Sequence, residues 1–154
     1  MSKRVTALEI ARKEVGTTEE GGGNNQKYGR WYRLNNQPWC AIFVSYVLFF
    51  SKVITNSQKC ASVPIIYTWY KNNNKLTRSP KAGDLVFFDF NSDGIFEHIG
   101  FLNKDYMPYD DYFETIEGNT SPNSKGSQDN GDGVYIKQRH KSIKMAFAKP
   151  NYEE

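Results

Sequence analysis

The sequence predicts one α+β domain, with helices in its first half and an antiparallel sheet in its second half. In the first half, apolar residues recur at helical spacing, whereas after Pro80 the apolar runs become short and lie between Gly, Asn and Asp turns. A length of 154 residues suits one domain, and the chain contains no internal repeat. We therefore expect residues 1–154 to form a single domain.

Three helices are expected in the first half. Residues 5–15 place apolar side chains on one stripe, and Gly16 ends that pattern. Residues 38–40 (PWC) open a second helix that runs to about residue 53 and is apolar on nearly every face, which is typical of a helix at the centre of a domain. A third helix should begin near Pro64, a residue favoured in the first turn, and end in the asparagines 72–74.

Five short strands are expected in the second half, separated by polar turn residues. They cover residues 85–88, 99–102, 113–116, 134–136 and 145–148. Two long polar stretches connect elements of the domain. Residues 17–36, rich in Gly, Asn, Tyr and Arg, form a loop long enough to suggest a function. Residues 119–133 form a loop within the domain, because strand-like residues resume after it.

The composition argues against two classes of function. A net charge of +3 is mild and no basic stripe is interleaved with aromatic residues, so nucleic-acid binding is not expected, although an anionic surface would attract the chain. No apolar run approaches the roughly 18 residues of a membrane span. The first residues lead into an amphipathic pattern rather than into the apolar stretch of a secretory signal. We expect a monomer that is made in the cytoplasm without a signal peptide and does not insert into membranes.

Cys40 is the candidate nucleophile. It stands at the start of the apolar helix, where unpaired N–H groups and the helix dipole favour a thiolate and offer a donor for an oxyanion. A thiolate needs a base and a group that orients the base. His98 begins an apolar strand and is the better base, because His140 lies in a basic stretch that is expected to be solvated. The other cysteine, Cys60, is interpreted as an ordinary free thiol.

The strand after His98 ends in Glu117 and Asn119, which offer a carboxylate and an amide on one face of that strand. Taken alone, Cys40 is more often an inert buried thiol, and His98 is more often a satisfied core histidine. A cysteine at a helix start, a histidine at a strand start and a glutamate at a strand end seldom occur together by accident. Their combination favours a thiol hydrolase.

Three segments resemble those of CHAP domains, the cysteine, histidine-dependent amidohydrolases/peptidases. Residues 38–45 (PWCAIFVS) resemble the nucleophile motif, residues 83–88 (GDLVFF) with 98–100 (HIG) resemble the histidine segment, and residues 116–119 (IEGN) resemble the third strand. Further stretches, at residues 27–31, 133–135 and 147–150, are similar to a phage-endolysin-like subgroup. The resemblance covers nearly the whole chain.

The resemblance implies a papain-like (NlpC-type) fold, with N-terminal helices packed on a C-terminal antiparallel sheet. It implies that Cys40 attacks, that His98 is the base and that Glu117 orients His98, with Asn119 as a second polar support. The implied activity is hydrolysis of peptide or amide bonds in bacterial peptidoglycan by a cysteine peptidase or amidase that needs no cofactor for the chemistry. A phage lysin, a tail component and a bacterial autolysin all fit this description. A papain-like amidase for a non-wall substrate and a non-catalytic wall-binding module are the alternatives.

Three aromatic residues that precede the nucleophile are expected to line a substrate groove. They are Tyr28, Trp31 and Trp39. Packing in the core or at its rim is the alternative for each of them, since aromatic side chains supply much of the buried area of any core.

Asp89, Asn91 and Asp93 reproduce the opening of a calcium loop, with oxygen ligands at alternate positions and a glycine at the sharp turn. Glu97 falls at the ninth position of such a loop, but the twelfth position is a glycine, so the usual bidentate glutamate is missing. A hairpin turn built on the Asp-Gly pair is the alternative. A calcium ion here would be structural, stiffening the turn that presents the candidate base.

Overall fold

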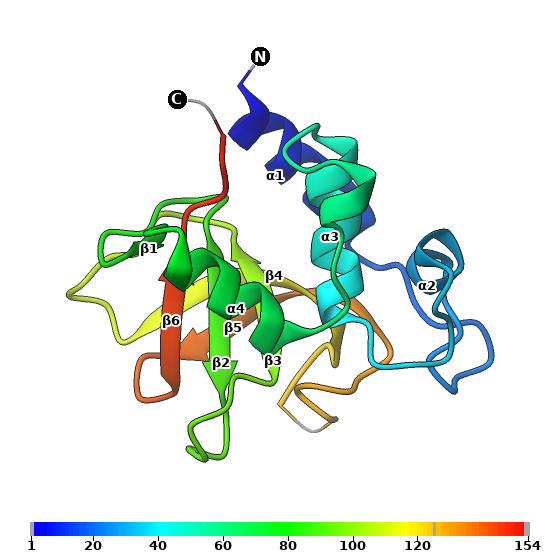
Figure 1. Ribbon diagram of the computed structural model, residues 1–154. Helices are drawn as coiled ribbons and strands as arrows, with labels where there is room; N and C mark the ends of the chain where they lie inside the picture. Colours follow the sequence, from blue (N-terminus) through cyan, green and yellow to red (C-terminus); the bar gives the residue numbers. More distant parts are fainter. Residues whose placement is uncertain (1, 125, 153–154) are drawn as a thin grey trace.

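The computed structural model describes residues 2–124 and 126–152, and it confirms the α+β class. Within these residues, helices occupy the first half of the chain, and a six-stranded sheet is built mainly from the second half. Figure 1 shows the helices gathered along one side of the sheet, with the first and last residues that the structure describes on the same side of the molecule. No helix in the part described is long and apolar enough to cross a membrane.

The helices are α1 (Lys3–Glu14), α2 (Lys27–Tyr32), α3 (Cys40–Phe50) and α4 (Val63–Asn72), with a 3-10 turn at Asn56–Gln58. Serine side chains begin two of them. Ser2 accepts a hydrogen bond from the N–H of Val5 in α1, and Ser62 accepts one from the N–H of Ile65 in α4. The three predicted helices are confirmed, with differences of a few residues at their ends.

Helix α2 was not predicted, because the sequence indicates only a loop over residues 17–36. Gln26 begins this helix, since its side chain accepts a hydrogen bond from the N–H of Gly29. Six residues with a glycine at their centre carry too little apolar periodicity to reveal a helix in the sequence. The rest of the predicted loop contains no other helix.

The strands are β1 (Leu76–Thr77), β2 (Leu85–Asp89), β3 (His98–Leu102), β4 (Tyr112–Thr120), β5 (Gly133–His140) and β6 (Lys144–Ala148). Their order in the sheet is β1-β6-β2-β3-β4-β5, and every neighbouring pair is antiparallel. All five predicted strands are confirmed. The two-residue β1 is too short to be read from a pattern, and it forms because Leu76 pairs with Ala148 at the sheet edge.

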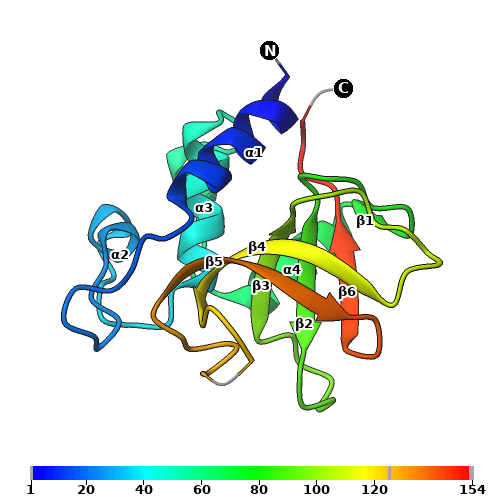
Figure 2. The same ribbon diagram turned by 180° about the vertical axis from the view of Figure 1, so that it is seen from behind.

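The two faces of the sheet support different clusters of buried residues. Phe87 on β2 contacts Tyr67 of α4 with ring centres 5.4 Å apart, and Phe101 on β3 contacts Phe43 of α3 at 6.3 Å. The opposite face carries a smaller apolar cluster: Val86, Phe88, Leu102 and Phe113. Figure 2 shows β4 and β5 sweeping across the view in front of the remaining strands, so the sheet is strongly curved.

A glycine on β4 lets the sheet approach the start of α3. An ideal Cβ on Gly118 would lie 2.8 Å from the Cβ of Phe43 and 3.0 Å from Cζ3 of Trp39. Both distances are shorter than ordinary packing allows, so only glycine fits here without movement. The contact brings the strand that carries Glu117 to the helix that begins at Cys40.

Candidate active site

Cys40 is the first residue of α3, and Trp39 is its N-cap residue without a side-chain capping bond. The cysteine is 4% exposed, and its sulfur lies 4.0 Å from the carbonyl oxygen of Glu97. The first N–H groups of a helix have no partner within the helix, and the helix dipole is positive at this end. The Cys40 sulfur therefore lies at the positive end of the α3 dipole. Both cysteines are free thiols, as predicted, and Cys60 lies elsewhere at intermediate exposure.

His98 is the first residue of β3 and has no exposed surface. Its Nε2 lies 2.7 Å from Oε1 of Glu117. The other ring nitrogen, Nδ1, has no hydrogen-bond partner of good geometry among the described residues. The Cys40 sulfur nevertheless lies close enough for its charge to act on the ring. Burial alone would lower the pKa of His98, but Cys40 and then Glu117 raise it to about 9. Cys40 and Glu117 together therefore favour the protonated form of the imidazole.

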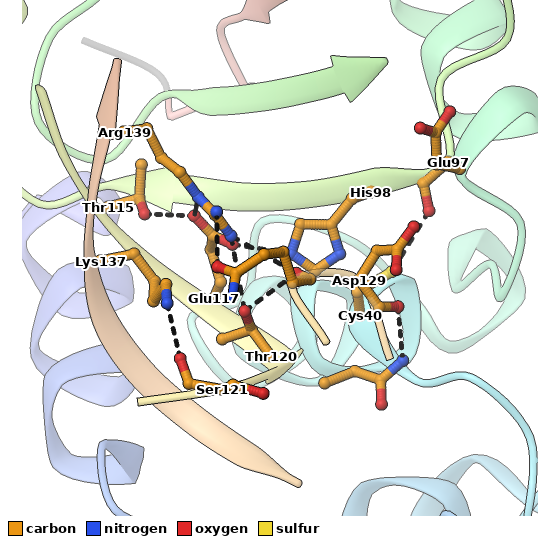
Figure 3. Close-up of polar contacts among 12 residues, drawn as sticks. Cys40, Glu97, His98, Thr115, Glu117, Thr120, Ser121, Asp129, Lys137 and Arg139 are labelled. Carbon is orange, nitrogen blue, oxygen red and sulfur yellow. Dashed lines mark hydrogen bonds and ion pairs between the residues drawn. The ribbon is translucent and has the colours of Figure 1, made fainter. Parts of the chain in front are cut away.

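Glu117 on β4 is also fully buried, and the surrounding donors satisfy its carboxylate. Besides His98, it accepts hydrogen bonds from Nε of Arg139 at 2.9 Å, from Nη2 of Arg139 at 2.5 Å and from the hydroxyl of Thr115. Burial alone would raise the pKa of Glu117, but the bonds from Arg139 and His98 lower it to about 2. Figure 3 shows Arg139, Glu117 and His98 arranged one after another toward Cys40.

Gly100 on β3 provides the space that this carboxylate needs. An ideal Cβ at this position would lie 2.6 Å from Cγ of Glu117 and 3.0 Å from the carbonyl oxygen of Ile116. Any larger residue would push Glu117 away from His98. The glycine that follows the His-Ile pair in the sequence motif thus has a packing role beside the site.

Asn119 lies two residues after Glu117, at an irregularity in the β4–β5 pairing, with a left-handed φ of 58°. It is completely buried, and its Nδ2 donates to the carbonyl oxygen of Asp129 at 3.2 Å. Its Oδ1 has no hydrogen-bond partner in the part of the chain described. The structure therefore shows no bond from Asn119 to His98, and its role as a second support stays a prediction.

Two buried cations, one of which bonds to Glu117, were missed in the sequence. Residues 137–141 read as a solvated basic stretch, and His140 is indeed exposed, but Lys137 and Arg139 are 6% and 5% exposed. The missed signal is the alternation along β5, because residues two apart in a strand face the same side. Lys137 donates through Nζ to the carbonyl oxygens of Ser121 and Asn123, and so holds the loop after β4.

The aromatic residues predicted to line a substrate groove are placed differently in the structure. Tyr28 and Trp39 have no exposed surface and stack with ring centres 5.4 Å apart, so they belong to the core. Trp31 is partly exposed but packs on Phe49 and Phe50, at the far end of α3 and roughly 14 Å along the helix from its first residue. The prediction is wrong for Tyr28 and Trp39, because a side chain without exposed surface cannot line a groove, and for Trp31 it stays a prediction.

A polar groove of about 580 Å³ lies between the first loop and the β4–β5 loop. Its lining includes Glu19, Asn24, Ser121, Asn130 and Asp132. Glu19 joins the groove to the site, because its carboxylate accepts a hydrogen bond from the indole N–H of Trp39 at 2.9 Å, directly before the nucleophile.

The β2–β3 hairpin gathers three carboxylates, and the calcium site expected at Asp89, Asn91 and Asp93 stays a prediction. Asp89, Asp93 and Glu97 each offer an oxygen, and these oxygens all lie within 4.8 Å of one another. Asp89 also accepts hydrogen bonds from the N–H groups of Asp93 and Gly94, so a tight turn and a carboxylate cluster coexist. Oε2 of Glu97 is buried without a partner in the described chain, while Asn91 is exposed. The donor set suits a hard cation such as calcium.

Neither a protein-family model nor a curated protein matches this chain. Among solved structures, it is similar to a wild-type endolysin, LysIME-EF1, with a TM-score of 0.54 and 17% sequence identity. The two proteins share a fold. The likeness covers 99% of this chain and 66% of LysIME-EF1, so the chain spans just under two thirds of the length of that endolysin. Fold does not fix function, so the activity has to be argued from the site.

Proposed function

We propose that this chain is a peptidoglycan hydrolase of the endolysin type, with a papain-like CHAP fold and a Cys-His-Glu thiol mechanism. The observation that carries the proposal is the buried line from Cys40 through His98 to Glu117. The fold shared with LysIME-EF1 and the CHAP-like motifs support the cell wall as the substrate.

In the first step, the thiolate of Cys40 attacks the carbonyl carbon of a peptide or amide bond and forms a C–S bond. The backbone N–H of Cys40, at the start of α3, is a donor for the oxyanion. The imidazolium of His98 gives its proton to the leaving nitrogen as the C–N bond breaks. The products of this step are a free amine and an acyl-enzyme.

In the second step, neutral His98 takes a proton from water, and the resulting hydroxide attacks the acyl carbon. The C–S bond breaks, a carboxylic acid leaves, and Cys40 returns as a thiolate beside a protonated His98. Glu117 keeps Nε2 of the ring occupied throughout, so that Nδ1 is the nitrogen that exchanges the proton.

The polar groove that includes Glu19, the hydrogen-bond partner of Trp39, is the surface on which we place the rest of the substrate. It offers carboxylates, amides and hydroxyls, which suit the hydroxyl and amide groups of muropeptides. This placement replaces the predicted aromatic groove, since Tyr28 and Trp39 are inaccessible.

Two alternative functions are supported by fewer observations. A non-catalytic wall-binding module does not need a thiol, an imidazole and a carboxylate buried next to one another. Burying charged groups costs free energy, so their presence favours a chemical role. A papain-like amidase for another substrate would use the same chemistry, so only the substrate distinguishes it.

The decisive experiment compares wild type, Cys40→Ala and Cys60→Ala on suspensions of purified bacterial walls. We expect wild type and Cys60→Ala to clear the suspension, and Cys40→Ala to be slower by about 10³-fold or more. Equal clearing by wild type and Cys40→Ala would overturn the mechanism. Mass spectrometry of the released muropeptides identifies the bond, since stem-peptide, cross-bridge and muramoyl-amide cleavage leave different new termini.

We further propose that the cluster of Asp89, Asp93 and Glu97 holds a structural calcium ion. Burial, together with the charges of Asp89 and Asp93, raises the pKa of Glu97, whereas at Asp89 burial is outweighed by N–H donors from the turn, which lower the pKa, and a bound cation would offset the charge on both. Such an ion would fix the hairpin that ends at His98 without entering the reaction.

A further inference from the structure

Arg139 on β5 is buried, and its guanidinium lies side by side with the carboxylate of Glu117. Nε donates to Oε2 at 2.9 Å, and Nη2 donates to Oε1 at 2.5 Å. Oε1 is also the atom that lies 2.7 Å from Nε2 of His98. The guanidinium and the imidazole therefore meet at one oxygen of a buried carboxylate, as Figure 3 shows.

We propose that Arg139 is a positioning residue of the active site, which fixes Glu117 and, through Glu117, holds the ring of His98 facing Cys40. The proposal rests on the thiol mechanism proposed above. Arg139 touches neither the sulfur nor, given its burial, a substrate. Its effect on the reaction passes through the carboxylate.

The hydrogen-bond inventory of Glu117 supports this role. An ionised carboxylate has about four acceptor positions. Arg139 fills two of them, His98 fills one and the hydroxyl of Thr115 fills another. Two parallel bonds from a planar fork prevent rotation of the carboxylate, which a single donor cannot do. The orientation of Glu117 therefore depends on Arg139 more than on its other partners.

A purely structural role is the competing explanation, because Arg139 also contacts the β4–β5 loop. Its Nη1 donates to the side-chain oxygen of Gln128 at 2.9 Å. Lys137 allows the two roles to be separated. It is a second buried cation on the same face of β5, it holds the same loop at Ser121 and Asn123, and it makes no hydrogen bond to Glu117 within the described residues.

The test is a double-mutant cycle between Glu117→Gln and Arg139→Met, with kcat and KM measured on solubilised wall fragments. In the wild-type background we expect Arg139→Met to lower kcat by about 30-fold or more and to change KM by less than about threefold. In the Glu117→Gln background the same change should lower kcat by less than about threefold, because its target has already been removed. Fully additive effects would overturn the proposal.

Arg139→Lys separates a loss of function from a loss of folding, because it keeps the buried positive charge but has no planar guanidinium. We expect it to melt closer to wild type than Arg139→Met does and still to lose about fivefold or more in kcat. Wild-type kcat in Arg139→Lys would contradict the role proposed for the fork. Lys137→Met is the matched control, and its effect should be additive with Glu117→Gln.

A substrate-independent readout keeps this inference separate from the proposed activity. The same cycle is run in a Cys60→Ala background, with the rate at which iodoacetamide alkylates Cys40 at a fixed pH as the readout. Non-additive rates without wall clearing would refute the proposed substrate and retain the positioning role. Additive alkylation rates together with wall clearing would refute the positioning role and retain the proposed function.

Discussion

At the scale of single residues, the site is a set of buried charges that stabilise one another. His98 and Glu117 have no exposed surface, and each would be costly to bury alone. Pairing with Cys40 raises the pKa of the imidazole, whereas pairing with Arg139 and His98 lowers the pKa of the carboxylate. Both directions favour the charged forms that thiol hydrolysis requires.

The lowered pKa of Glu117 predicts a specific loss of stability in acid. Its pKa falls from an ordinary value of 4.5 to about 2 on folding, so its contribution is fully present above pH 4.5 and is lost as the pH falls toward 2. The shift corresponds to about 3 kcal/mol of unfolding free energy. Urea unfolding between pH 6 and pH 3, chosen to span roughly this interval, should show a weaker pH dependence in Glu117→Gln than in wild type.

Glu9→Gln is the control for this experiment, because Glu9 is exposed on α1. It should keep the acid dependence of the wild type. The same dependence in wild type and Glu117→Gln would show that the buried carboxylate is not linked to folding in this way.

At the scale of elements, the β2–β3 hairpin connects the carboxylate cluster to the base. Glu97, whose carboxylate joins the cluster, directly precedes His98, and its carbonyl oxygen contacts the sulfur of Cys40. Glu97 also accepts a hydrogen bond from the N–H of Phe90 across the hairpin. An ion bound by the hairpin would therefore restrict the same backbone that presents the base.

Calcium should raise the melting temperature of the protein relative to a sample with chelator, because a ligand that binds only the folded state stabilises it. Asp93→Asn combined with Glu97→Gln should abolish this difference. Asp110→Asn, which changes an exposed acidic residue elsewhere, should retain it. If the wild type has the same melting temperature with calcium and with chelator, the proposed calcium site is wrong.

At the scale of the whole molecule, the active site depends on how closely the helical layer approaches the sheet. Cys40 belongs to α3, whereas His98 and Glu117 belong to β3 and β4. At Gly118, the backbone of β4 lies so close to Phe43 of α3 that an added Cβ would clash with it. The close approach of the helix that begins at the proposed nucleophile to the strand that carries Glu117 therefore depends on a residue without a side chain.

Gly118→Ala tests this dependence. The added methyl group would meet Phe43 and Trp39, so we expect a loss of about 1–3 kcal/mol in unfolding free energy. Because the two layers must separate to admit it, wall clearing by the folded variant should fall by about tenfold or more. Chemical denaturation and clearing rates measure the two effects. Wild-type values in both would show that the layers have more room than the structure indicates.

The sequence by itself determined the positions of the main helices and strands, and the order along the chain of the thiol, the imidazole and the carboxylate. Helical and strand patterns depend on neighbouring residues, so the predicted helices and strands were recovered, and Cys40 and His98 were placed at the starts of their elements. Glu117 followed because it lies on the next strand. These features are local in the chain, and a single sequence can reveal them.

Only the tertiary structure decided which side chains are buried and which partners they meet. Arg139 lies 22 residues after Glu117, and their contact depends on the register between β4 and β5. The burial of Tyr28 and Trp39 depends likewise on how α2 packs against α3. Register and packing are set by interactions between distant segments, and a sequence pattern records only what neighbours in the chain impose.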